Sequence, residues 1–78
     1  MDHIARHGVT QDEAEDVCYG DALALHTRRR LYQLIGRTAE GRLLSVMISP
    51  REPGAYYVVT ARDATDVERR LARRKGQL

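Results

Sequence analysis

Three apolar, β-branched-rich runs separated by short connections constrain the fold of this chain more than any other feature. The runs are Leu31–Thr38, Arg42–Ser49 and Ala55–Arg62. A short loop ending in Gly41 joins the first two, which is typical of an antiparallel hairpin. The third run follows a turn over residues 50–54, whose two prolines and glycine disfavour regular structure. Because neither connection is long enough for a parallel crossover, we predict three adjacent antiparallel strands.

Two capping boxes indicate where helices begin. Thr10 with Glu13 predicts the start of a helix that ends at Gly20, and Thr65 with Glu68 predicts the start of a C-terminal helix.

Two weaker signals complete the set of elements. A short helix is predicted over Asp2–His7, closed by Gly8 in the left-handed conformation, and Ala22–His26 can add an edge strand. The predicted fold class is α+β: two N-terminal helices, a three- to four-stranded antiparallel sheet and a C-terminal helix. We find no repeat or linker, so residues 1–78 are expected to form a single domain.

The central run has one wholly apolar face, made by Leu44, Val46 and Ile48. We predict that the helices cover this face, with Val17 and Leu71 in the same core. The opposite face is mixed and consists of Leu43, Ser45, Met47 and Ser49. We expect it to stay open, with Thr60 and Arg62, or Gln33 and Arg37, supplying polar groups to it.

The chain contains a single cysteine, Cys18, which excludes an internal disulfide and any multi-cysteine zinc site. No apolar run approaches the roughly 18 residues that span a bilayer. Residues 1–3 lack the basic-then-apolar order of a signal peptide. We therefore expect a cytoplasmic protein that is neither membrane-bound nor exported.

Charge is divided sharply along the sequence. Residues 1–27 hold one arginine against six acids, whereas residues 28–78 hold twelve basic residues against five acids. A basic second half fits a protein that meets phosphates or an acidic protein partner, and it fits a merely solvated surface equally well.

Five short segments occur in a recognisable order: residues 6–10 (Arg-His-Gly-Val-Thr), 34–37 (Leu-Ile-Gly-Arg), 41–46 (Gly-Arg-Leu-Leu-Ser-Val), 60–65 (Thr-Ala-Arg-Asp-Ala-Thr) and 68–70 (Glu-Arg-Arg). Together they resemble the BrnT family of type II toxins, whose members have a RelE-like fold. The chain departs from the family pattern in three respects. It lacks the usual N-terminal strand, has Thr60 where serine is common, and has Leu71–Lys75 where a tyrosine often follows the Glu-Arg-Arg run.

The resemblance implies a metal-independent ribonuclease toxin that halts translation and needs no cofactor. Its partners would be an RNA substrate and a cognate antitoxin encoded nearby, in a homodimer or a toxin–antitoxin heterotetramer. A non-catalytic module that binds antitoxin or RNA is the alternative. A DNA-binding domain is disfavoured, because the basic C-terminal helix has no helix-turn-helix partner before it.

RNA cleavage without a metal requires charge stabilisation on the phosphorane and the transfer of two protons. Arg62 and Arg37 are the candidates for holding the phosphate, because guanidinium groups pair bidentately with its oxygens. His7 is the candidate proton-transfer group. Each has a structural alternative: Arg62 can pair with Glu68 or Asp66, Arg37 can be a hairpin-end charge, and His7 can cap a helix.

Further basic residues are candidates for binding the RNA backbone or an acidic antitoxin segment; they are Arg28, Arg29, Arg30, Arg69 and Arg70. Arg42 is expected to be solvated. Tyr56 and Tyr57 must point to opposite faces of their strand, so one of them can stack a base while the other joins the core. His3 and His7 have metal-ligand spacing, yet no third ligand is evident nearby, and we predict no metal site.

Overall fold

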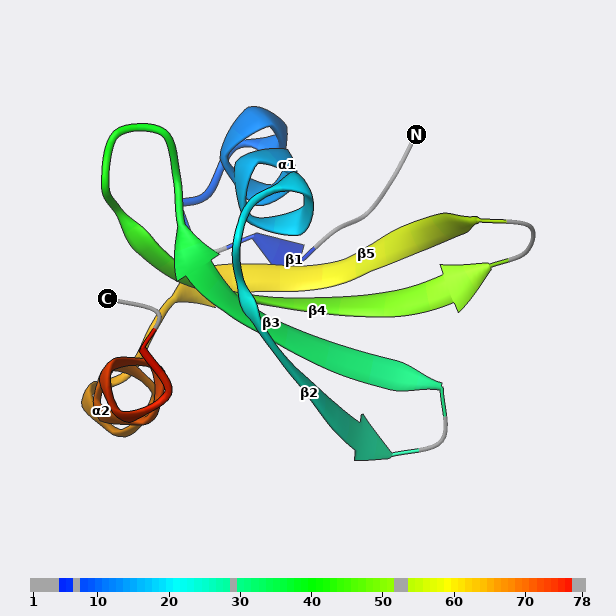
Figure 1. Ribbon diagram of the computed structural model, residues 1–78. Helices are drawn as coiled ribbons and strands as arrows, with labels where there is room; N and C mark the ends of the chain where they lie inside the picture. Colours follow the sequence, from blue (N-terminus) through cyan, green and yellow to red (C-terminus); the bar gives the residue numbers. More distant parts are fainter. Residues whose placement is uncertain (1–4, 7, 29, 52–53, 77–78) are drawn as a thin grey trace.

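One five-stranded sheet carries a helix on each of its faces (Figure 1). The computed structural model describes residues 5–6, 8–28, 30–51 and 54–76. The elements in chain order are β1 (Ala5–Arg6), α1 (Gln11–Tyr19), β2 (Leu23–Arg28), β3 (Leu31–Arg37), β4 (Leu43–Arg51), β5 (Ala55–Asp63) and α2 (Asp66–Arg74). The strand order across the sheet is β1-β5-β4-β3-β2.

Strands β2 to β5 form a meander in which each strand pairs antiparallel with the next. The predicted adjacency of the three long strands is thus confirmed, and the predicted edge strand is present as β2. Ser45 occupies the middle of the register, because it pairs with Ile35 on β3 and with Arg62 on β5.

The predicted first helix is wrong. Ala5–Arg6 form the short strand β1, which pairs parallel with Thr60 and Ala61 of β5. The described residues contain two helices rather than three, and the sheet has five strands rather than three or four. The chain is α+β, but the strand at its N-terminal end is fixed by a distant partner that local signals do not reveal. Gly8 does adopt a positive φ of 75°, leading the chain into α1.

Both predicted capping boxes form. The Glu13 amide donates to Thr10 Oγ1 at 3.1 Å and the Thr10 amide donates to Glu13 Oε1 at 3.0 Å, and Thr65 and Glu68 make the same pair of bonds in α2. Each helix has nine residues. Across the part of the chain that the structure describes, no helix has the length and apolar character that crossing a bilayer requires.

The core is divided between the two faces of the sheet. Leu44 and Val46 of β4 are buried together with Val17 of α1, and Ile48 packs against them. Leu71 does not join them, contrary to the prediction, but packs with Ile35 on the other face, under α2. Ala72 of α2 is buried against Ile35 and Leu43, so the mixed face is partly covered rather than open.

Strand β4 also runs further than expected, through Pro50 to Arg51. Pro50 pairs with Tyr56 of β5, whereas the pairing of β4 with β3 ends at Ile48. The missing amide hydrogen of the proline is tolerated because only one neighbouring strand is present at that point.

Candidate functional site

A polar cluster lies at the margin of α2, on the face of the sheet that this helix partly covers. We call it the Arg62 cluster; its members are Gln33 on β3, Ser45 on β4, Arg62 on β5 and Glu68 in the first turn of α2. The strand register places Ser45 beside Arg62. The capping box fixes the position of the Glu68 side chain in the first turn of α2.

Glu68 is the centre of this cluster. Arg62 donates to both of its carboxylate oxygens, from Nη1 at 2.9 Å and from Nη2 at 2.8 Å. Gln33 Nε2 donates to Glu68 at 2.6 Å and to Ser45 Oγ at 2.8 Å. The Thr65 amide donates to the carboxylate as well, at 2.9 Å. Only 14% of the Glu68 side chain is exposed, so the carboxylate depends on these donors.

The electrostatics of the pair follow from this geometry. The Arg62 guanidinium lowers the pKa of Glu68 to about 2, with help from the Thr65 amide and against the cost of burial. Glu68 in turn raises the pKa of Arg62. At neutral pH Glu68 is therefore an ionised anchor and a weak proton acceptor.

Arg62 keeps donors for a ligand. Its three hydrogen bonds go to Glu68 and to the Asp63 carbonyl oxygen, and its Nε–H has no bond to any described residue. The side chain is 38% exposed. The sequence leaves open whether Arg62 is structural or functional. The structure places it in the ion pair with Glu68 and leaves part of the side chain exposed.

A β-bulge decides which tyrosine shares the face of the Arg62 cluster. Thr60 pairs with Met47 and Val58 pairs with Ile48, so Val59 is an extra residue in β5. Because of this bulge, Tyr57 shares a face with Arg62, although an unbroken alternation would have placed Tyr56 there.

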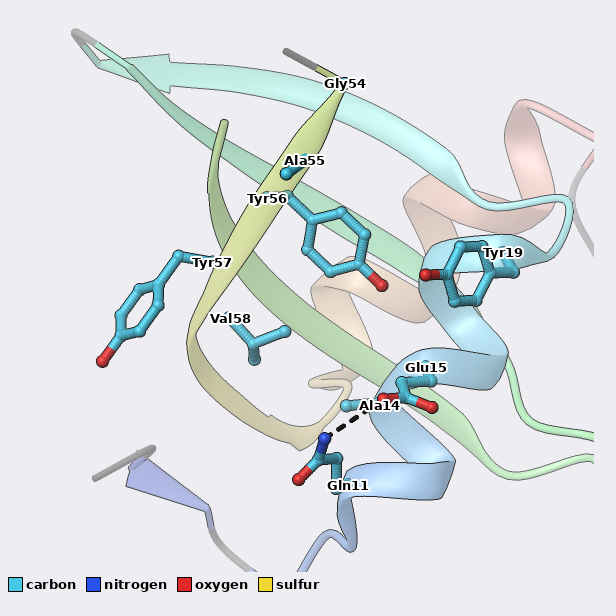
Figure 2. A pocket seen from close by; sticks show the side chains of 9 residues that line it. All are labelled: Gln11, Ala14, Glu15, Tyr19, Gly54, Ala55, Tyr56, Tyr57 and Val58. Atoms are coloured by element: carbon cyan, nitrogen blue, oxygen red, sulfur yellow. Dashed lines mark hydrogen bonds between the residues drawn. The ribbon is translucent and has the colours of Figure 1, made fainter. Parts of the chain in front are cut away.

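The two tyrosines point away from each other, as predicted (Figure 2). Tyr56 contacts Tyr19 of α1, with ring centroids 6.0 Å apart. Tyr57 is 39% exposed and has the Arg51 guanidinium 5.5 Å from its ring centroid. Tyr57 is therefore the tyrosine that can stack a base on the face of the Arg62 cluster.

The structure does not bring Arg37 to Arg62. Arg37 Nη1 donates to the Gly41 carbonyl oxygen at 2.6 Å, within its own hairpin. Ile35 and Leu43, which lie between the two arginines on this face, are covered by Ala72 of α2. Arg37 thus has the hairpin-end position that was its structural alternative.

The other candidate residues are dispersed. Arg28 and Arg30 are exposed at the β2–β3 turn, and Figure 1 shows this turn and α2 at opposite ends of the sheet. Arg69 and Arg70 are exposed on α2. His3, His7 and Arg29 lie outside the described residues.

Arg42 is a structural hub, where a solvated side chain was expected. Its Nε donates to Asp63 at 2.8 Å, and its Nη1 donates to Glu13 at 3.1 Å and to the Gly8 carbonyl oxygen at 2.9 Å. It lowers the pKa of Asp63. Arg42 thereby ties the start of α1 to strands β4 and β5.

Sequence reasoning missed the role of Ser45 and the bond from Gln33 to Glu68. The alternation along the strands was a usable signal, because it places Gln33, Ser45 and Arg62 on one face once the hairpin register is known. The pair of Arg62 with Glu68 was foreseen as the structural alternative for Arg62, whereas the bond from Gln33 depends on how α2 packs on the sheet and has no local signal.

Comparisons with protein-family models, with curated proteins and with solved structures find no match to this chain. They therefore assign no family or activity to the chain. The functional interpretation depends on the geometry of the Arg62 cluster and on the motifs in the sequence.

Proposed function

We propose that this chain is a cytoplasmic, RNA-cleaving toxin of a type II toxin–antitoxin pair, and that the Arg62 cluster is its phosphate-binding site. The observation that carries the proposal is the partly exposed side chain of Arg62, whose guanidinium is held by Glu68 through both Nη atoms. Glu68 is held in turn by Gln33 and by the Thr65 amide. A ligand-binding charge that is fixed by its neighbours in this way is preorganised.

The chemistry of the guanidinium favours a phosphate as its ligand. Arginine stays charged at every physiological pH and its planar donors match two phosphate oxygens. Charge that develops on the phosphate during attack by the 2′-hydroxyl would be stabilised without reorganisation of the site.

The same face offers a path for a single strand. Tyr57 lies five positions before Arg62 on β5, roughly 15 Å away at the usual rise of a strand. A base stacked on Tyr57 would place its neighbours along the strand toward Arg62, and Arg51 beside the ring adds a positive charge.

Proton transfer needs a group other than Glu68. A carboxylate whose pKa is about 2 removes a proton from a hydroxyl poorly at neutral pH. His7 stays the predicted proton-transfer group in this proposal.

A second candidate function is a non-catalytic RNA-binding module of the same fold. It is favoured by the same low pKa of Glu68 and by the neutralisation of Arg62 within the ion pair. In either case we expect a cognate antitoxin encoded nearby as the protein partner.

The test is a cleavage and binding assay with purified chain and end-labelled single-stranded RNA, with and without chelator. Arg62→Ala should lower cleavage by about a hundredfold, the scale seen when one charge-stabilising donor is removed. Arg62→Lys should restore little, because an ammonium cannot make the two-pronged contact. Arg73→Ala is the matched control, since it removes the same charge from an exposed position on α2 that is not among the candidate RNA-binding residues.

The outcomes separate the candidates. Binding without cleavage that is lost in Arg62→Ala and in Tyr57→Ala identifies the non-catalytic module. Equal losses in Arg62→Ala and Arg73→Ala, or cleavage that vanishes with chelator, contradict the proposed site.

A further inference from the structure

A groove of about 380 Å³ lies between α1 and the start of β5, on the face of the sheet opposite the Arg62 cluster (Figure 2). The rings of Tyr19 and Tyr56 stand on one side of it, and Gln11 and Glu15 on the other. Ala14 also lines the groove, so part of its surface is apolar. This volume is enough for one long side chain.

The lining of the groove fits an organic cation. Among the lining residues that the structure describes, Glu15 is the one ionisable acid or base besides the tyrosines. Gln11 Nε2 donates to Glu15 Oε2 at 3.1 Å, which orients the carboxylate and leaves Oε1 without a bond to any described residue. The faces of tyrosine rings attract ammonium and guanidinium groups. Tyr19, although aromatic, is 77% exposed, so its ring contributes little to the core.

The acidic surface continues beyond the groove. Two further hollows along α1 are lined by Asp12 and Asp16, and Glu40 lines one of them. In the part of the chain that the structure describes, no arginine or lysine lines any of the three hollows. The surface is therefore longer than one side chain and repels RNA, and it complements a chain segment with several basic residues.

We propose that this groove binds an arginine or lysine side chain from a basic segment of a partner protein. The aliphatic stem lies on Ala14, the cationic end lies between the tyrosine rings and Glu15, and the neighbouring basic residues of the segment face Asp12 and Asp16. The proposal does not depend on the ribonuclease function, because the groove and the Arg62 cluster lie on different faces.

The first test uses the peptide acetyl-Ala-Arg-Ala-Arg-Ala-amide with the full chain, followed by backbone amide chemical shifts. We expect shifts at Gln11, Glu15, Tyr19 and Tyr56. The same peptide with citrulline in place of arginine, which has the shape but no charge, should bind at least several-fold more weakly. Equal binding of the two peptides, or shifts confined to other residues, would overturn the proposal.

The second test uses variants with a matched control. Glu15→Gln and Tyr19→Ala should each weaken binding of the arginine peptide roughly two- to fivefold, the range for exposed ion pairs and exposed cation–π contacts. Asp21→Asn removes the same charge from an exposed residue that lines none of the hollows, and should change binding less than Glu15→Gln. An equal effect would show attraction by net charge alone and would overturn the proposal.

A third measurement distinguishes the source of the cation. Ethylguanidinium, a free guanidinium compound with a single charge, should bind more weakly than the peptide, because it has no second cationic group for Asp12 or Asp16. Ethylguanidinium binding as tight as that of the peptide would refute docking of a chain segment. Unchanged thermal midpoints of the variants exclude loss of folding as the cause of weaker binding.

Discussion

The ion pair between Glu68 and Arg62 makes a quantitative prediction about acid stability. The pKa of Glu68 is about 2 in the folded chain against an ordinary value of 4.5. At about 1.4 kcal/mol per pKa unit, this difference corresponds to at most about 3.5 kcal/mol of stability. Arg62 is partly exposed and solvent screens the pair, so we expect about 1–2 kcal/mol.

The sign follows from the direction of the shift. When the pKa of a carboxyl group is lower in the folded chain than in the unfolded chain, the group contributes its full stabilisation at pH values above its pKa in the unfolded chain. This contribution is lost as the pH falls through its pKa in the folded chain. Glu68 should therefore contribute fully above about pH 5 and progressively less between pH 4.5 and about pH 2. Glu68→Gln should remove this contribution at neutral pH.

The assay is urea unfolding followed by circular dichroism at a series of pH values from 7 to 2. Glu68→Gln should be about 1–2 kcal/mol less stable than the wild type at pH 7. The two proteins should converge near pH 2. Arg62→Ala and the double variant complete a cycle in which the two single losses should not add, because they break the same pair.

One result would refute this reasoning. If the difference between the wild type and Glu68→Gln stays the same from pH 7 to pH 2, then Glu68 stabilises the chain through its capping bonds with Thr65 and not through its charge. Additive losses in the cycle would lead to the same conclusion.

Three further predictions test the core, the sheet and the limits of the site. Val46 is fully buried, so Val46→Ala should cost about 1–3 kcal/mol of unfolding free energy, measured by the same urea titration. A Cβ on Gly36 would lie 2.9 Å from that of Ala22, so Gly36→Ala should destabilise by about 1–3 kcal/mol, and an unchanged urea midpoint would contradict this packing. Arg37 bonds within its own hairpin, so Arg37→Ala should keep RNA cleavage within about twofold of wild type, a change like that of other exposed residues. A loss of cleavage as large as that of Arg62→Ala would show that Arg37 takes part in the site.

The parts of the fold that are encoded locally could be predicted from the sequence. The loop ending in Gly41 fixes a hairpin, and Thr10 and Glu13 form the capping box through bonds within the first turn of their own helix. Such signals act over a few residues, so they do not depend on how the rest of the chain is arranged.

The parts that depend on distant residues could not be predicted. Strand β1 exists because Ala5 and Thr60 pair across almost the whole chain. The apolar positions of α2, such as Leu71, suit either face of the sheet. In the structure the helix packs on the face that carries Ile35, which the local sequence does not reveal. The bulge at Val59 has no glycine or other marker, yet it reverses the face of Tyr57.

The same division applies to the candidate site. Arg62 was identified from its place at the end of a strand before a capped helix. Gln33 and Ser45 join it only through the register of three strands, and Glu68 only because α2 packs on that face. A candidate site built from four elements is visible in the sequence only in part, because its full membership depends on the strand register and on the packing of α2.

Strand β1 has a consequence for the order in which the chain folds and opens. The hairpins from β2 to β5 join neighbours in sequence and can form early, whereas the parallel contact of β1 with β5 must close a loop that includes α1 and the whole meander. With only two residues in this strand, the contact is the easiest in the sheet to break while the rest stays folded. Amide hydrogens of β1 should therefore exchange with solvent by local opening, and those in the middle of β4 only by unfolding of the whole domain.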